Sequence, residues 1–314
     1  MRLTFAAAIL FGLILPAWAQ DTRTITDHSG FEVTIPAEPL RIVSLHDWTA
    51  TVMTHELGGN LVGSSGRLAK DGTYFIRSGR ELYDLGFDDI AMASVHGELN
   101  MEMIAELKPD LIIGNVGDTL DYREQLATIA PTVMFDPQNG RAPLDNYADL
   151  AQWVNRTEKF DDLHGAYQAR VQAAKAELFP GGETPTYVAM TPNPEDGDLR
   201  IFRNYGAQTT VLEDLGFVHA AITDRVPAGS QEANFSAEVI GELNSDYIFT
   251  THIADQGETA TTMMEQLDQV APGYRAFLTA AQNGQFISMD RFYVYPTTFA
   301  AMNHVLDELD TVLK

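Results

Sequence analysis

The length, composition and charge of this chain narrow the classes of protein to which it can belong. Its 314 residues are 45% hydrophobic and 20% charged, which suits two globular domains and excludes extended disorder. The formal net charge of −24 disfavours nucleic acid as a partner, and the absence of cysteine excludes disulfides. Any anion-binding site would need basic residues gathered locally.

The first twenty residues have the pattern of a secretory signal. Arg2 precedes an apolar run over residues 5–15, and Ala17-Trp18-Ala19 forms an A-x-A cleavage pattern. We therefore predict a signal peptide over residues 1–19. The apolar run is short for a membrane span, and no cysteine is available for a lipid anchor. An exported chain of this kind is expected in the periplasm of a Gram-negative cell.

Strand and helix patterns alternate along the first part of the chain. The segment "RTITDHSGFEVTI" predicts a β-hairpin, and "RIVSL" predicts a short buried strand followed by a helix with Asp47 as its N-cap. Further strands are predicted in "LVGSS", "DLIIG" and "PTVMF". This alternation favours a parallel sheet with crossover helices, in a first lobe over residues 20–142.

A helical region separates the two halves. Residues 143–179 contain two predicted helices, the second at about 157–178, and "FPGGETP" then breaks the pattern. Strands and helices alternate again over residues 180–314. We therefore predict an α/β protein of two lobes, each with a mostly parallel central sheet flanked by helices, joined by a single long inter-lobe helix.

The two halves also share a short repeat. "NMEMIAELKPDLIIG" (100–114) and "SAEVIGELNSDYIFT" (236–250) are identical at six positions when aligned, and the alignment pairs Glu102 with Glu238. Average composition would give roughly one identity over such a window. Each half therefore carries the same helix-then-strand unit.

With these segments in this order, the chain resembles the class III periplasmic solute-binding proteins of ABC importers, which carry ferric siderophores, haem or cobalamin. The resemblance covers nearly the whole mature chain, and "NMEMIAELKPDLIIG" is its most specific piece. It implies two α/β lobes that hold a ligand between them, and one glutamate on each lobe, here Glu102 and Glu238, that docks the permease. The residues alone also allow ordinary first-turn glutamates that favour the helix dipole.

Candidate ligand contacts follow the predicted strands, because pockets in open α/β sheets lie beyond the carboxyl ends of strands. Arginine holds oxygen anions in bidentate geometry, and aromatic rings can pack on the organic part of a chelate. We expect an anionic ferric chelate held by arginines from both lobes, although each arginine could instead be a solvated surface charge. The candidate ligand-binding residues are Trp48, Arg67, Tyr74, Arg77, Arg203, Tyr205, Arg225 and Tyr293, of which Arg67, Arg203 and Arg225 have the best positions.

The residues leave other functions open. His46, His96, His219 and His252 follow predicted strands and could bind zinc or manganese, and a tyrosine or histidine could ligate haem. However, the chain has no H-x-H or H-E-x-x-H motif, and no G-x-S-x-G, P-loop or G-x-G-x-x-G motif.

We therefore predict a monomeric periplasmic binding protein, not an enzyme, with neither a cofactor nor a metal held by its own side chains. It captures a ferric siderophore and delivers it to an ABC permease in the inner membrane. The alternatives are a haem- or cobalamin-binding protein of the same importer type, or a protein that binds zinc or manganese directly.

Overall fold

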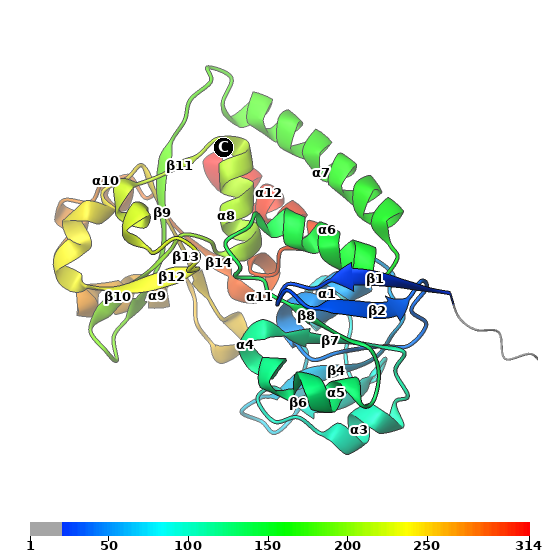
Figure 1. Ribbon diagram of the computed structural model, residues 1–314. Coiled ribbons are helices and arrows are strands. Elements are labelled where there is room, and N and C mark those ends of the chain that lie inside the picture. The colour runs from blue at the N-terminus through cyan, green and yellow to red at the C-terminus, as the bar shows by residue number, and fades with distance from the viewer. Residues whose placement is uncertain (1–20) are drawn as a thin grey trace, which may run out of the picture.

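The computed structural model describes residues 21–314, and the predicted signal peptide lies outside this range. The described residues form two α/β lobes, each with its own six-stranded sheet, as Figure 1 shows. This arrangement confirms the predicted fold class. The sheet of the first lobe ends in sequence at Phe135 and that of the second begins at Thr186, so the predicted divisions near 142 and 179 fall in the segment between the sheets.

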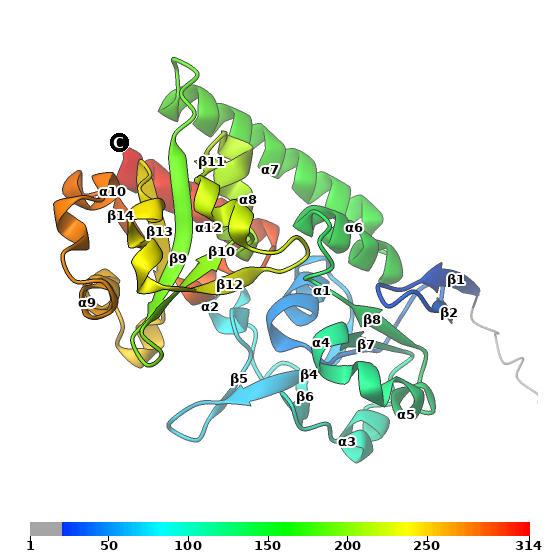
Figure 2. The ribbon, with the colours of Figure 1, turned by 60° about the vertical axis from the view of Figure 1, so that its left-hand side comes forward.

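The N-terminal lobe has the strand order β5-β4-β3-β7-β8, with β6 paired to β4. Its strands pair in parallel except for β5, which folds back against β4 as a hairpin that projects from the lobe in Figure 2. Strands β3 and β7 are buried along their whole length, as expected for parallel strands covered on both faces. The strands are β3 (Ile42–Ser44), β4 (Leu61–Leu68), β5 (Tyr74–Phe75), β6 (Ala91–Val95), β7 (Leu111–Asn115) and β8 (Thr132–Phe135).

The helices of this lobe are short, and the predicted hairpin at its start is confirmed as an antiparallel pair. The prediction of Asp47 as an N-cap is wrong, because the His46 side chain accepts the capping hydrogen bond from the Thr49 N–H group. The elements are β1 (Thr22–Thr26), β2 (Glu32–Pro36), η1 (Asp47–Thr51), α1 (Val52–Glu56), α2 (Gly79–Tyr83), α3 (Met101–Glu106), α4 (Val116–Thr119), η2 (Leu120–Tyr122) and α5 (Arg123–Ala127).

The C-terminal lobe has the strand order β12-β10-β9-β13-β14, with β11 paired to β9. Strands β9, β11, β13 and β14 pair in parallel, but β10 pairs antiparallel with both β9 and β12. A turn with Asp196 and Gly197, the latter at φ 69°, joins β9 to β10, and Asp-Gly is a common hairpin signal. The strands are β9 (Thr186–Asn193), β10 (Asp198–Phe202), β11 (Val218–His219), β12 (Glu232–Ser236), β13 (Tyr247–His252) and β14 (Phe286–Asp290).

The second copy of the sequence repeat departs from the first in its local structure. The first copy forms the α-helix α3, whereas residues Ala237–Leu243 form the 3-10 helix η4, which contains Gly241, a weak helix former. The segment directly after β14 forms the helix α11. The helical elements are α8 (Gly206–Leu215), η3 (Ala221–Arg225), η4, η5 (Ala254–Gln256), α9 (Ala260–Val270), η6 (Tyr274–Ala276), α10 (Thr279–Gln282), α11 (Arg291–Val294) and α12 (Phe299–Leu313).

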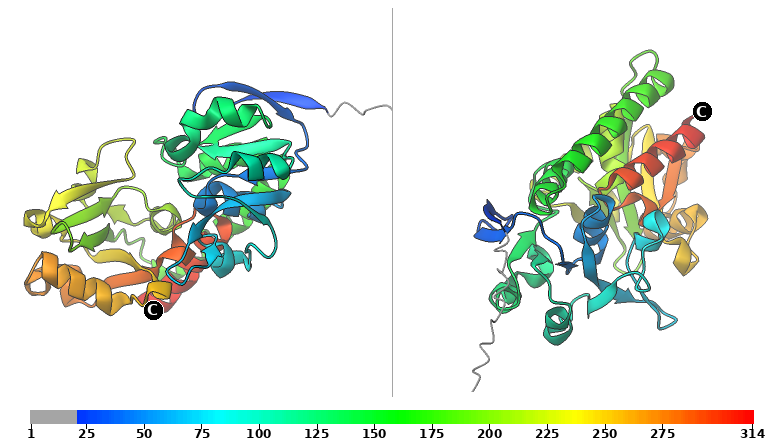
Figure 3. Two further views of the ribbon diagram at one scale, coloured as in Figure 1. Left: turned by 90° about the horizontal axis from the view of Figure 1, so that it is seen from below. Right: turned by 90° about the vertical axis from the view of Figure 1, so that its right-hand side faces the viewer.

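Helices α6 (Pro143–Trp153) and α7 (Thr157–Leu178) connect the lobes. Helix α7 occupies the range predicted for the inter-lobe helix, and its 22 residues span about 33 Å. The right-hand view of Figure 3 shows α7 and α12 side by side, and the two helices contact one another. One continuous hydrophobic cluster contains buried residues of both lobes and of α6 and α7, so the lobes share a core.

Glu56, at the end of α1, ties the two lobes together. Its carboxylate accepts hydrogen bonds from the N–H groups of Phe299 (2.8 Å) and Ala300 (2.7 Å), in the first turn of α12. It also accepts hydrogen bonds from the hydroxyls of Tyr147 (2.6 Å) and Tyr83 (3.0 Å). A carboxylate at a helix N-terminus satisfies free donors and complements the helix dipole. This contact fixes how the C-terminal lobe sits on the N-terminal lobe.

Candidate functional site

Charged side chains collect where the parallel strands of the N-terminal lobe end. His46 and Asp47 follow β3, Arg67 lies near the end of β4, His96 follows β6, and Asp118 lies in α4 after β7. Because the carboxyl ends of parallel strands meet at one edge of a sheet, these residues come together. We refer to them, with Trp48, Arg77 and the C-terminal-lobe residue Arg291, as the arginine cluster.

Asp47 is the buried anchor of the arginine cluster. Its carboxylate accepts two hydrogen bonds of 2.8 Å from the Arg77 guanidinium, in bidentate geometry. Burial alone would raise the pKa of Asp47, but the hydrogen bonds and positive charge of Arg77 outweigh burial, so its pKa is lowered. Asp47 therefore stays ionised and neutralises Arg77.

Arg67 and Arg291 reach the cluster from opposite lobes without a comparable partner. The Arg67 Nε atom lies 3.8 Å from an Asp47 oxygen, too far for a hydrogen bond. Within residues 21–314, Arg291 forms no ion pair, and the buried Nε atoms of both arginines make no hydrogen bond. Burial lowers the pKa of Arg67, and the positive charges of Arg77 and Arg291 act in the same direction. Two guanidinium groups with free donors fit an anion.

Trp48 supports the arginines and is covered by them. The Arg77 guanidinium lies 4.0 Å and the Arg291 guanidinium 4.7 Å from the centre of the indole, and the Tyr295 ring lies 3.9 Å from it. The indole Nε1 donates a hydrogen bond to the Ser78 hydroxyl at 3.0 Å. These side chains cover the faces of the indole, so little of its surface is accessible for stacking with a ligand ring.

Two histidines complete the cluster. The Nε2 atom of His46 lies 3.7 Å and that of His96 3.8 Å from oxygens of Asp118, and the ring centres are 5.9 Å apart. Burial lowers the pKa of His46 to about 4 and also lowers the pKa of His96. Both imidazoles are therefore neutral at pH 7, so that the three arginines outweigh the two carboxylates.

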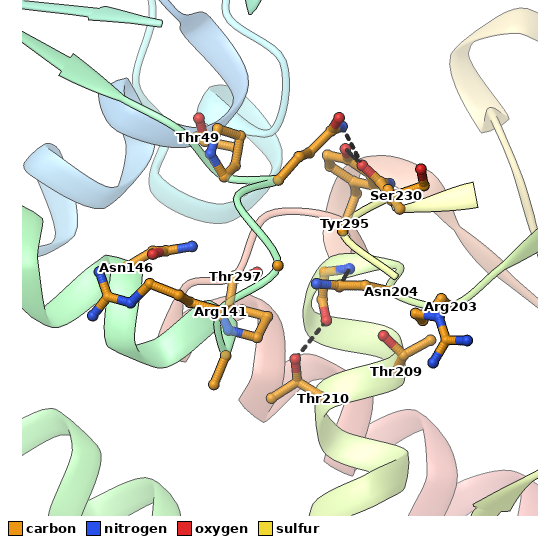
Figure 4. Close-up of a pocket in the computed structure, with 18 of the residues that line it drawn as sticks. Thr49, Arg141, Asn146, Arg203, Asn204, Thr209, Thr210, Ser230, Tyr295 and Thr297 are labelled. Atoms are coloured by element: carbon orange, nitrogen blue, oxygen red, sulfur yellow. Dashed lines mark hydrogen bonds between the residues drawn. The ribbon is translucent and has the colours of Figure 1, made fainter. Parts of the chain in front are cut away.

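A pocket of about 360 Å³ adjoins the arginine cluster, and Thr49 and Tyr295 belong to its lining. Figure 4 shows Arg141 on one side of the pocket and Thr210 on the other, from the N-terminal and C-terminal lobes respectively. The other lining residues are both polar and apolar, and most come from the loop before α6, the start of α6, the loop before α8, the first turns of α8 and the loop over 229–231. The pocket therefore lies between the lobes.

Close backbone packing and an amide contact define this pocket. Gly206 has φ 55°, and an added Cβ there would lie 1.6 Å from the Tyr295 carbonyl oxygen, so only glycine fits. The Gln138 amide donates to Gln231 Oε1 at 2.5 Å, and the Tyr295 hydroxyl donates to the same oxygen at 3.1 Å. The Gln138–Gln231 contact bridges the two lobes beside the arginine cluster.

The structure brings together some of the predicted contacts. Trp48, Arg67 and Arg77 lie in the arginine cluster. Arg203 lines the pocket, but its guanidinium donates hydrogen bonds to the carbonyls of Thr223 (3.1 Å) and Val226 (2.9 Å). Tyr205 is only 1% exposed and donates or accepts a hydrogen bond with Thr251 at 2.9 Å, so it supports the site from beneath.

Three predicted contacts lie elsewhere. Tyr74 is 45% exposed and pairs with Leu68, so it faces away from Arg67, whose partner on the hairpin is Phe75. Arg225 forms an exposed ion pair with Glu242 at 2.8 Å. Tyr293 stacks on His304 with ring centres 4.6 Å apart. Neither the arginine cluster nor the pocket lining includes these three side chains.

Arg291 and Tyr295 are the residues that the sequence-based choice missed. Arg291 immediately follows β14, and this position at a strand end was the available signal. Metal-site geometry gives no further candidate, because no group of three or more His, Cys, Asp or Glu side chains in residues 21–314 is arranged to hold a metal ion. Nor does this part of the chain contain a helix with the length and apolar character needed to cross a membrane.

Comparisons with known proteins give consistent matches. The sequence profile described as "Periplasmic binding protein" matches residues 68–293. The Fe(3+)-citrate-binding protein YfmC of Bacillus subtilis is 26% identical over 275 residues, which are 87% of this chain and 80% of that protein. The probable siderophore-binding lipoprotein YfiY of the same organism is 29% identical over 303 residues, which are 92% of this chain and 87% of that protein.

Solved structures also match over most of the chain. The crystal structure of Staphylococcus aureus SirA complexed with staphyloferrin B has a TM-score of 0.74 at 22% identity, covering 93% of this chain and 98% of that one. The siderophore periplasmic binding protein from the fuscachelin gene cluster of Thermobifida fusca has a TM-score of 0.64 at 26% identity, covering 89% and 98% respectively. At 22% identity, the similarity to SirA shows a shared fold only.

Proposed function

Because the chain belongs to the periplasmic binding protein family, we propose that it captures a ferric siderophore between its two lobes and delivers it to an ABC permease for iron uptake. In this proposal it acts in the periplasm as a monomeric binder, without catalysis. The observation that carries the proposal is the pair Arg67 and Arg291, which reach one cluster from opposite lobes with unpaired donors. The names of the relatives YfmC and YfiY agree with it.

The arginine cluster favours a ferric chelate with peripheral carboxylates. Each charge-assisted hydrogen bond from a guanidinium to a carboxylate contributes on the order of 1.5–3 kcal/mol. A neutral chelate would leave the donors of Arg67 and Arg291 unpaired. Aromatic rings of a ligand would find the Trp48 faces already covered by Arg77, Arg291 and Tyr295. Ferric citrate is the simplest chelate with this chemistry.

Delivery to the permease is assigned to Glu102 and Glu238. Both side chains are exposed, and each lies in the first turn of its helix, α3 or η4. Neither belongs to the arginine cluster or lines the pocket between the lobes. Exposed charges of this kind steer association and fix the register of a complex more than they add affinity.

A titration panel tests the proposed function. The mature protein is titrated calorimetrically with ferric citrate, a ferric hydroxamate, a ferric catecholate, haem, cobalamin and Zn²⁺. We expect saturable one-to-one binding of ferric citrate, and weaker binding of the hydroxamate. Tight binding of Zn²⁺, without a response to any ferric chelate, would contradict the proposal.

A further inference from the structure

A second surface pocket, of about 510 Å³, lies beside Glu102. It is formed by residues 92–95 of β6 and by residues 98–103, which lead into and begin α3. Figure 1 shows β6 and α3 together in the N-terminal lobe, on the far side from the C-terminal sheet. The pocket is therefore separate from the one between the lobes.

Methionines supply much of the apolar lining of this pocket. Met92, Met101 and Met103 are all half-buried, and Met101 also packs against the core of the lobe, in which Ile104 of the same helix is fully buried. Part of each methionine side chain is thus open to contact from outside. The flexible, polarisable thioether lets methionine adapt to apolar partners, and it is favoured at binding surfaces for that reason.

Two acidic side chains belong to the same lining. Glu98 and Glu102 both line the pocket and are exposed, and no lysine or arginine is among the lining residues. An apolar centre with a negative rim is complementary to an apolar side chain flanked by a basic one. Glu102 belongs both to this pocket and to the proposed docking contact, so the two surfaces are continuous.

The two copies of the sequence repeat, one in each lobe, differ in the residues beside the paired glutamates. Aligning the copies pairs Glu102 with Glu238, but it pairs Met101 with Ala237 and Met103 with Val239. The C-terminal copy is also a 3-10 helix in place of an α-helix. The two glutamates are therefore equivalent in charge, while the methionines occur beside only one of them.

We propose that the methionine-lined pocket receives an apolar side chain of the permease, next to the basic side chain that pairs with Glu102. This inference rests on the proposed function. Because of this pocket, the permease binds the N-terminal lobe more tightly than the C-terminal lobe. The pocket thereby sets the orientation of the protein on the importer.

Uptake by spheroplasts tests this contact. Spheroplasts of the source cell, washed free of their own periplasmic proteins, receive purified protein loaded with ⁵⁵Fe(III)-citrate, and uptake is measured against protein concentration. In the double variant Met101→Gln/Met103→Gln, the half-maximal protein concentration should rise about tenfold, since an apolar anchor is replaced by a polar one. The variant Met101→Leu/Met103→Leu should stay within about threefold of the wild type, because its side chains remain apolar.

The matched control is Ala237→Gln, at the position that the repeat pairs with Met101. It should change the half-maximal concentration by less than about threefold, and ferric citrate affinity should stay unchanged in every variant. The proposal is overturned if the methionine-to-glutamine variant supports normal uptake, or if Ala237→Gln weakens uptake equally.

Two alternative occupants of the pocket, membrane lipid and a second copy of the chain, are tested by separate measurements. Binding of the wild type to protein-free liposomes of inner-membrane lipids, lost in the glutamine variant, would replace the permease by lipid. A wild-type dimer in sedimentation that the variant abolishes would replace it by a second copy of the chain. The variant Glu102→Ala/Glu238→Ala distinguishes docking through the glutamates from the contact at the methionine-lined pocket. If it abolishes uptake and the methionine changes do not, only the pocket proposal fails. If neither set of changes affects uptake, the proposed docking fails as well.

Discussion

The Glu56 contact and the two arginines Arg67 and Arg291 all lie where the two lobes meet, but they differ in how fully their hydrogen-bonding groups are satisfied. Glu56 accepts hydrogen bonds from two tyrosine hydroxyls and from two backbone N–H groups of α12. Arg67 and Arg291 have buried Nε atoms that find no acceptor within residues 21–314. Buried polar groups are normally paired, so the first region is complete in the free protein, whereas the second keeps donors that are available to a ligand.

Removing Asp47 should produce the largest loss of stability, because its fully buried carboxylate is the bidentate partner of Arg77. The variant Asp47→Ala leaves the guanidinium of Arg77, with a side chain only 12% exposed, without its bidentate partner. Breaking such a buried pair costs about 3–5 kcal/mol. Chemical denaturation of the ligand-free protein measures this change, and a loss below about 1 kcal/mol would show that Arg77 finds other acceptors.

The variant Glu56→Ala should destabilise the protein somewhat less. It leaves the first N–H groups of α12 and the Tyr147 hydroxyl without their acceptor, which costs roughly 2–4 kcal/mol. The matched control is Glu102→Ala, an exposed glutamate in the first turn of a helix, which should cost less than about 1 kcal/mol. Equal unfolding midpoints for the two variants would contradict the role of Glu56 as an inter-lobe contact.

The arginine cluster should also make stability depend on pH. Burial lowers the pKa of His46 to about 4 from its ordinary value near 6.5, so the unfolded chain binds a proton more readily than the folded protein. Stability from the neutral imidazole is complete above pH 6.5 and is lost as the pH falls from 6.5 to about 4. Near pH 5 the loss from this group is on the order of 2 kcal/mol.

The variant His46→Asn isolates this contribution, because asparagine can still cap η1 but does not titrate in this range. Thermal unfolding midpoints between pH 7 and pH 4.5 should fall less steeply in the variant than in the wild type. Parallel curves would mean that His46 is accessible to protons in the folded state.

The smallest effect is expected at Arg225. Its ion pair with Glu242 joins two half-exposed side chains, and exposed pairs contribute at most about 1 kcal/mol. The variant Arg225→Ala should therefore unfold within about 1 kcal/mol of the wild type and bind ferric citrate normally. A tenfold loss of affinity would show that Arg225 takes part in ligand binding.

The sequence predicted the fold more completely than the site, since strands and helices depend on local pattern while contacts depend on register. Helix α7 follows from helical spacing within a single segment. By contrast, Tyr74 faces away from Arg67 because of the β4–β5 pairing, and Arg225 is held by Glu242 through packing of η3 on η4. Arg291 lies in the cluster because the chain after β14 forms the helix α11, and its guanidinium lies over Trp48.

The most direct test of the account is the affinity of three single variants for ferric citrate. Tryptophan fluorescence can follow the titration, because Trp48 lies under the Arg77 and Arg291 guanidiniums. Arg67→Ala and Arg291→Ala should each weaken binding about tenfold or more, while Arg225→Ala should leave it within twofold of the wild type. Equal affinities in all three variants, with wild-type stability, would contradict the claim that Arg67 and Arg291 hold the ligand between the lobes.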